Sequence, residues 1–168
     1  MRERLTAIGV AILLCAAVPQ GHAQGVAKTL VRATMPNDVG IELLGKALLY
    51  SFSYQRMLGT TFGLEAGLGA LGEGGASSSN TMIVFVPVSA KVYLIPKDGT
   101  LYLTGGAVLA TASTNSGPLD NATDFYGHAG LGFEFRSPGG FLFRGTAYGL
   151  FAEGSYFIWP GITIGYAF

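Results

Sequence analysis

Cysteine is nearly absent from this chain: Cys15 is the only one, and it lies in a segment that we expect to be cleaved. Residues 1–23 combine a basic start, an apolar run over residues 5–18 and a small residue, Ala23, at the end. These are the parts of a secretory signal peptide, so we predict cleavage after Ala23 and leave residues 1–23 out of the fold. The mature chain would then have no disulfide and no cysteine metal site.

Histidine is equally scarce, because only His128 remains after residue 23. A metal site needs several nitrogen or sulfur ligands, so one histidine without cysteine predicts no metal site. Residues 67–72 match the glycine pattern of dinucleotide sites by letter, but a glycine and serine stretch follows where such a site needs a helix. We therefore expect no cofactor.

Charge is also sparse: charged residues make up only 12% of the chain, about half of the ~25% typical of soluble domains. Without residues 1–23 the chain keeps eight basic and nine acidic side chains, a net charge of about −1. This balance provides no basic face for nucleic acid, so no nucleic-acid partner is expected. So few charges would also cover a water-facing surface poorly.

Long hydrophobic runs are missing too, since no stretch after residue 23 reaches the ~20 consecutive apolar residues of a membrane-spanning helix. An exported chain that is too apolar for water and has no such helix is typical of a membrane β-barrel, the other structure that satisfies every backbone group in lipid. The alternative is a soluble lipocalin-like barrel, which would keep its apolar face inside and turn charged faces to water.

The chain does have a regular alternation of large apolar and small residues. At its end, Ile162, Ile164, Tyr166 and Phe168 are separated by single small residues, which predicts a strand with one apolar face. Similar alternation predicts strands at residues 39–43, 50–55, 62–69, 82–94, 101–112, 124–136, 141–151 and 156–168. A phase change between the first two strands predicts a tight turn or bulge near residues 45–48.

The connections between these strands alternate in length. Short turns are expected at residues 58–61, 96–99 and 137–140, long polar loops at residues 72–80 and 113–121, and a shorter loop at residues 152–155. Outer-membrane barrels have short periplasmic turns and longer external loops. We therefore predict an all-β fold, an eight-stranded antiparallel up-and-down transmembrane β-barrel over residues 38–168, with residues 24–37 as a periplasmic lead-in.

The signal peptide, the eight amphipathic strands and the closing run of residues 162–168 occur together with further runs at residues 41–45, 49–54 and 157–161. In these features the chain resembles small eight-stranded outer-membrane β-barrel proteins of Gram-negative bacteria, with uncharacterised proteins among them. The resemblance implies export to the outer membrane, contact with outer-membrane lipid and a monomer. It also implies assembly by periplasmic chaperones and the barrel-assembly machinery, with Tyr166 and Phe168 in the terminal assembly signal.

One face of each strand points into a barrel, so charges on the less apolar faces are candidates for a polar network in the lumen. These candidates are Glu42, Glu65, Lys91, His128, Glu134, Arg136 and Arg144. Unpaired buried charges are costly, so we expect salt bridges that plug the lumen. A path for protons or ions and a site for one small ligand remain alternatives. Trp159 belongs either to an interfacial aromatic girdle or to the lumen.

The expected role is non-enzymatic: envelope structure, surface contact through the external loops, or binding of a small ligand. The same fold also hosts lipid-modifying enzymes and narrow channels, so both remain alternatives. A hydrolase like the outer-membrane lipid A deacylases would pair a nearby serine with His128, but Gly130 stands two residues on. His128 is also expected in the lumen, away from lipid, so we predict no catalytic residue.

Overall fold

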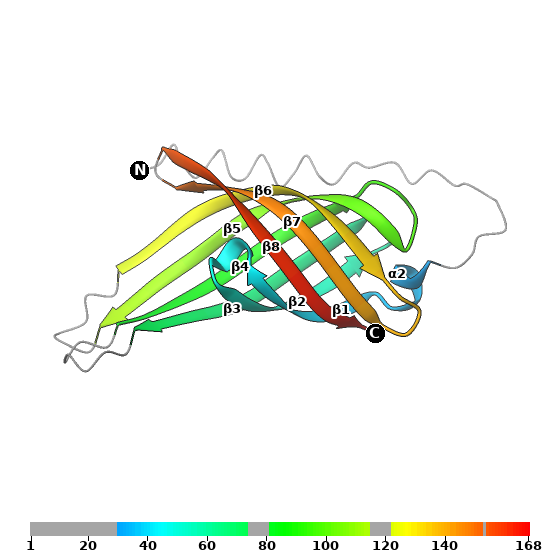
Figure 1. The fold of residues 1–168 in the computed structure, drawn as a ribbon, viewed down its shortest axis with the longest axis horizontal. Coiled ribbons are helices and arrows are strands. Elements are labelled where there is room, and N and C mark those ends of the chain that lie inside the picture. Colours follow the sequence, from blue (N-terminus) through cyan, green and yellow to red (C-terminus); the bar gives the residue numbers. More distant parts are fainter. Residues whose placement is uncertain (1–29, 74–80, 115–121, 153) are drawn as a thin grey trace.

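The computed structural model describes residues 30–73, 81–114, 122–152 and 154–168, and in them eight antiparallel strands close into a barrel (Figure 1). The strands are β1 (Asn37–Leu44), β2 (Tyr50–Leu58), β3 (Phe62–Glu73), β4 (Thr81–Tyr93), β5 (Gly99–Thr114), β6 (Ala122–Arg136), β7 (Phe141–Ala152) and β8 (Ser155–Ala167). Each strand pairs with its neighbours in sequence, and β1 closes the ring against β8. The predicted eight-stranded up-and-down barrel is confirmed. No helix in these residues is long and apolar enough to cross a membrane.

Side-chain alternation decides which face of each strand points inward. In β1, Val39, Ile41 and Leu43 are exposed, whereas Asp38 and Glu42 are buried. The other strands follow the same rule, so the wall is apolar outside and its largest buried side chains are mostly polar. This distribution suits a surrounding of lipid. It contradicts the lipocalin-like alternative, because that barrel would bury its apolar face.

The strands differ in length at one end of the barrel, which we call the loop end. β1 and β2 have 8 and 9 residues, whereas β5 and β6 have 16 and 15. Between β1 and β2 the chain folds inward as a 3₁₀ turn, η2 (Gly45–Ala47), and all three of its residues are buried. Leu44 and Leu48 flank η2 with φ of 59° and 70°, a left-handed conformation that leucine rarely adopts. η2 is the turn that the phase change in the sequence predicts.

Several strands, β3 and β5 among them, extend further at the loop end than the alternation predicts. β3 includes Gly72 and Glu73, and β5 includes Ser113 and Thr114, which the sequence pattern assigns to loops. Small and polar residues carry little strand signal of their own, so the pattern fades before the pairing with β4 ends. The rest of these expected loops, residues 74–80 and 115–121, lies outside the described residues.

The opposite end, which we call the turn end, carries the short connections and both ends of the described chain. The helix α2 (Val31–Thr34) buries Val31 and Arg32 there, and Val31 N–H donates to Asp98 Oδ1 at 3.0 Å. Phe168 N–H donates to the carbonyl of Asn37 at 2.8 Å, so the chain end meets the start of β1. The described part of the lead-in thus packs against the barrel opening (Figure 1). Residues 1–29, with the expected signal peptide, lie outside the described residues.

Candidate functional site

All seven candidate lumen residues are buried inside the barrel, each at most 3% exposed. They are Glu42 on β1, Glu65 on β3, Lys91 on β4, His128, Glu134 and Arg136 on β6, and Arg144 on β7. Three further charged residues are buried with them: Arg32 of α2, Asp38 of β1 and Lys46 of η2. Within the described residues, the lumen therefore contains cationic and carboxylate side chains from the strands, from α2 and from η2.

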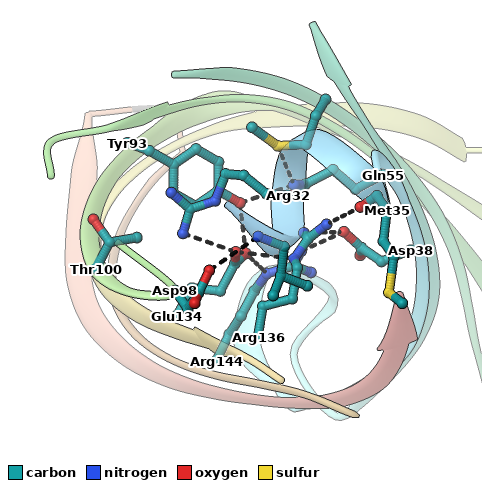
Figure 2. Close-up of polar contacts among 12 residues, drawn as sticks. Arg32, Met35, Asp38, Gln55, Tyr93, Asp98, Thr100, Glu134, Arg136 and Arg144 are labelled. Atoms are coloured by element: carbon teal, nitrogen blue, oxygen red, sulfur yellow. Dashed lines mark hydrogen bonds and ion pairs between the residues drawn. The ribbon is translucent and has the colours of Figure 1, made fainter. Parts of the chain in front are cut away.

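The turn end of the lumen holds a cluster of two arginines and two carboxylates, Asp38, Glu134, Arg136 and Arg144, which we call the turn-end cluster (Figure 2). Glu134 and Arg144 are partners in the β6–β7 ladder, and Arg144 Nε donates to Glu134 Oε2 at 2.7 Å. Nη2 of Arg144 and Nη2 of Arg136 both donate to Asp38 Oδ2, at 2.7 and 2.6 Å. Asp38 thus holds two guanidinium groups through short, charge-assisted hydrogen bonds.

Tyr93 connects this cluster to the segment that precedes the barrel. Its hydroxyl donates to Glu134 Oε2 at 2.6 Å and accepts from Gln55 Nε2 at 2.8 Å. The guanidinium of Arg32 lies over the Tyr93 ring, 4.5 Å from its centroid, and Arg32 Nη2 donates to the carbonyl of Lys97 at 2.9 Å. The ion pair of Arg32 with Glu134 is long, at 3.6 Å. One arginine therefore attaches α2 through a carbonyl, a ring and a weak ion pair.

Nearer the loop end, Glu42, Lys46, Glu65 and Lys91 form a second group, the loop-end cluster. Lys46 Nζ lies 2.9 Å from Glu42 Oε2 and 2.6 Å from Glu65 Oε1. Lys91 Nζ lies 2.6 Å from the other oxygen of Glu65. Tyr148 OH donates to Glu42 Oε1 at 2.7 Å. Both carboxylates therefore use both of their oxygens, and the inserted Lys46 bridges them.

Arg144 joins the two clusters, because its Nη1 lies 3.5 Å from Glu65 Oε2. Every cation and carboxylate of the network consequently has an oppositely charged atom within 4.0 Å. Removing one partner of a buried pair leaves the other charge uncompensated, so such a network resists rearrangement. A paired charge network of this kind is suited to holding the strands, α2 and η2 in place.

Beyond the loop-end cluster the lumen becomes apolar. Ala47, Phe85 and Val108 form a buried core, with Leu48, Leu71, Ile83, Ala110 and Tyr126 packed against it. Trp159 Nε1 donates to the carbonyl of Leu48 at 3.2 Å, which places Trp159 on the inner face, one of its two expected positions. η2 thus helps to cover the loop-end side of the ionic network with apolar side chains.

His128 does meet a serine, although not one close in sequence. The hydroxyl oxygen Oγ of Ser89 on β4 lies 3.0 Å from His128 Nε2, and both residues are buried. Gly106 lies between them on β5, where a Cβ would come within 2.8 Å of the His128 ring. His128 Nδ1 has no hydrogen-bond partner among the described residues, so a third group that would orient the ring as a base is missing there.

Tyr166 and Phe168, the residues of the expected assembly signal, are both exposed on the outer face at the turn end. Tyr166 pairs with Val39 of β1 and Phe141 of β7, so the terminal strand is the seam at which the barrel closes. Among the described residues, no group of three or more histidine, cysteine, aspartate or glutamate side chains is arranged to hold a metal ion.

Comparison with known proteins identifies the fold of this chain but finds no close relative. The N-terminal β-barrel domain of OprF from Pseudomonas aeruginosa matches with a TM-score of 0.56 and 14% identity, over 79% of this chain and 95% of that chain. The fold is that of an eight-stranded outer-membrane barrel. The attachment invasion locus protein Ail of Yersinia pestis, in complex with the heparin analogue sucrose octasulfate, matches with a TM-score of 0.46 and 14% identity, over 78% of this chain and 92% of that chain. No protein-family model and no curated protein matches the sequence.

Residues that alternation alone could not find include Arg32 and Lys46, because neither lies on a strand. The alternation could have identified Asp38, since it is in phase with Glu42 on the inner face of β1. Ser89 could be paired with His128 only once the register of β4, β5 and β6 was known. Helix and turn insertions and strand register are therefore the features that a single sequence leaves undetermined.

Proposed function

We propose that this protein is an integral outer-membrane barrel with a structural and surface-contact role, and that its lumen is closed. The observation that carries the proposal is the filling of the lumen from both ends. α2 brings Arg32 into the turn end and η2 brings Lys46 into the loop end, and a continuous ionic network joins them. An eight-stranded barrel is wide enough only for its own side chains or one small ligand, so this filling favours a scaffold over a pore.

The unequal strands support surface contact. β3 to β6 carry the two long polar connections, residues 74–80 and 115–121, and the loop end faces outward if the short turns lie in the periplasm. The ionic network fixes the strands below these connections, so the barrel would act as a rigid base for them. Assembly by periplasmic chaperones and the barrel-assembly machinery, through Tyr166 and Phe168, is part of the same proposal.

The membrane part of the proposal is tested by gel mobility of the mature chain folded into detergent, with and without boiling. A closed membrane barrel is expected to resist SDS and to migrate differently until it is heated. A chain that stays in solution without detergent and shows no shift would contradict the membrane location. For the structural role, a strain without the gene should become more sensitive to detergents and large antibiotics, and the intact gene should restore resistance.

The second candidate is a lipid-modifying enzyme, and the Ser89–His128 contact is the observation that favours it. Both side chains lie inside the barrel, whereas a lipid substrate would approach the outer wall. Mass spectrometry of lipid A with and without the gene separates the candidates. An acyl pattern that changes with the gene, and that Ser89→Ala fails to restore, would replace the structural proposal by an enzymatic one.

A further inference from the structure

A charged residue, Arg56, lies on the outer wall of the barrel. Arg56 on β2 is exposed and points outward, in the phase of Tyr54 and Leu58. Among the strand residues whose side chains are described, it is the one charged residue on the outward face. An arginine costs little free energy at a membrane interface but much more at the bilayer midplane, so its depth in the wall matters.

Arg56 lies near the turn end, two residues before β2 ends. It pairs across the ladder with Asn37, the first residue of β1. Arg56 Nη1 donates to Asn37 Oδ1 at 3.4 Å, and Tyr54 OH donates to the same oxygen at 2.8 Å. The guanidinium is therefore held beside a tyrosine and an amide at the level where the short turns begin, which is an interfacial position.

Directly beyond Tyr54 the outer wall is hollowed into an open groove of about 740 Å³ across β8, β1, β2 and β3. Ile41, Phe52 and Ile164 are among its walls, and Tyr54 and Tyr166 border it near Arg56. Its floor is the backbone of these strands, where Gly40, Gly67 and Gly165 lie in the inward phase between the outward apolar side chains. A Cβ at Gly165 would come within 2.3 Å of the Val39 carbonyl, so the strands pack too closely there for any other residue.

We propose that this surface binds one phospholipid of the periplasmic leaflet, with its phosphate on Arg56 and Asn37 and one acyl chain in the groove. The inference rests on the proposed outer-membrane location. The guanidinium matches a phosphate in charge and geometry, and the apolar groove that starts at Tyr54 matches a hydrocarbon chain. A second copy of this chain fits worse, because a symmetric contact would bring one Arg56 towards another with no outward carboxylate among the described strand residues.

The test is native mass spectrometry of the mature chain in detergent, titrated with phosphatidylglycerol and phosphatidylcholine of identical acyl chains. The wild-type barrel is expected to retain one phosphatidylglycerol about fivefold more strongly than phosphatidylcholine. Arg56→Gln should remove this preference, and Arg56→Lys should keep part of it, because the charge remains without the fork. Lys97→Gln removes an exposed charge at the same end and should leave the preference unchanged.

The groove is tested by filling it. Ala66 is exposed on β3 and lines the groove, whereas Ala129 is exposed on β6 in another part of the wall. Ala66→Phe should weaken retention of both lipids by about threefold or more, because the acyl chain loses its contact area. Ala129→Phe is the matched control and should retain both lipids as the wild type does.

Equal retention of the two lipids, unchanged by Arg56→Gln, would overturn the inference and leave only unspecific lipid. A dimer peak that Ala66→Phe abolishes while lipid retention stays the same would assign the face to a second copy and overturn it too. Heat-dependent gel mobility checks that each variant is folded, and Arg56→Gln decides alone if Ala66→Phe does not fold. A wild-type barrel that folds and shifts on heating but shows no lipid preference contradicts this inference without affecting the proposed function.

Discussion

The two segments inserted into the lumen, η2 at the loop end and α2 at the turn end, each bury one cation, yet they are held very differently. Lys46 of η2 contacts two carboxylates at 2.9 and 2.6 Å. Arg32 of α2 has one long ion pair at 3.6 Å, and its Nε and Nη1 have no hydrogen-bond partner among the described residues. η2 is therefore part of the barrel's charge network, whereas α2 is attached to its edge.

The backbone shows the same difference. Leu44 and Leu48 on either side of η2 have positive φ, whereas Leu30 and Met35 on either side of α2 have φ of −63° and −124°. A strained backbone persists only where the surrounding contacts hold it. The loop-end contacts evidently suffice for that, which indicates that η2 is the firmer plug and α2 the one that opens more easily.

The largest effect is expected at Arg144, because it belongs to both ends of the network. Arg144→Met should lower the free energy of unfolding by ~3–5 kcal/mol, since Asp38 and Glu134 lose a short contact and stay buried. Urea titration of the folded barrel in detergent micelles measures this, with Lys97→Met as an exposed control. A loss no greater than that of the control would mean that the network does not stabilise the barrel.

Lys46→Met should have the second largest effect, a loss of ~3 kcal/mol. Glu65 keeps Lys91 and Glu42 keeps the Tyr148 hydroxyl, so neither carboxylate is left without any partner. The same urea titration, with the same exposed control, measures the loss. A loss as small as that caused by changing Arg32 would remove the contrast between the two plugs.

Arg32→Met should lower the free energy of unfolding by only ~1 kcal/mol, because its hydrogen bond to a carbonyl and its ring contact are the main interactions lost. The change should be visible locally, as faster proteolysis within residues 30–36 while the barrel stays intact. Proteolysis at the wild-type rate would show that α2 is held by contacts other than Arg32.

The smallest effects compare the backbone at the two plugs. Leu44→Gly should change the free energy of unfolding by less than ~0.5 kcal/mol, because relief of the left-handed conformation offsets the entropy of glycine and the lost side chain. Met35→Gly has no strain to relieve and should destabilise by ~1 kcal/mol. Equal losses at the two positions, measured by urea titration, would show that the leucine conformation stores no strain.

Strand alternation predicted the barrel because the period of two is a local property of each strand, clear in runs such as residues 162–168. It also selected Glu65, Lys91 and Arg144, since each is in phase with the inner face of its strand. It could not place Lys46 or the pairing of Ser89 with His128. Those depend on an inward-folded turn and on register across three strands, which only tertiary contacts determine.

The central claim is that two plugs and a paired charge network close the lumen, and single-channel recording tests it most directly. The wild-type barrel, shown to be folded by its heat-dependent gel mobility, is inserted into a planar bilayer at saturating protein. The closed lumen predicts a silent bilayer over the full range of applied voltage. Reproducible conductance steps from the wild-type protein would contradict the account and assign the lumen to a narrow channel.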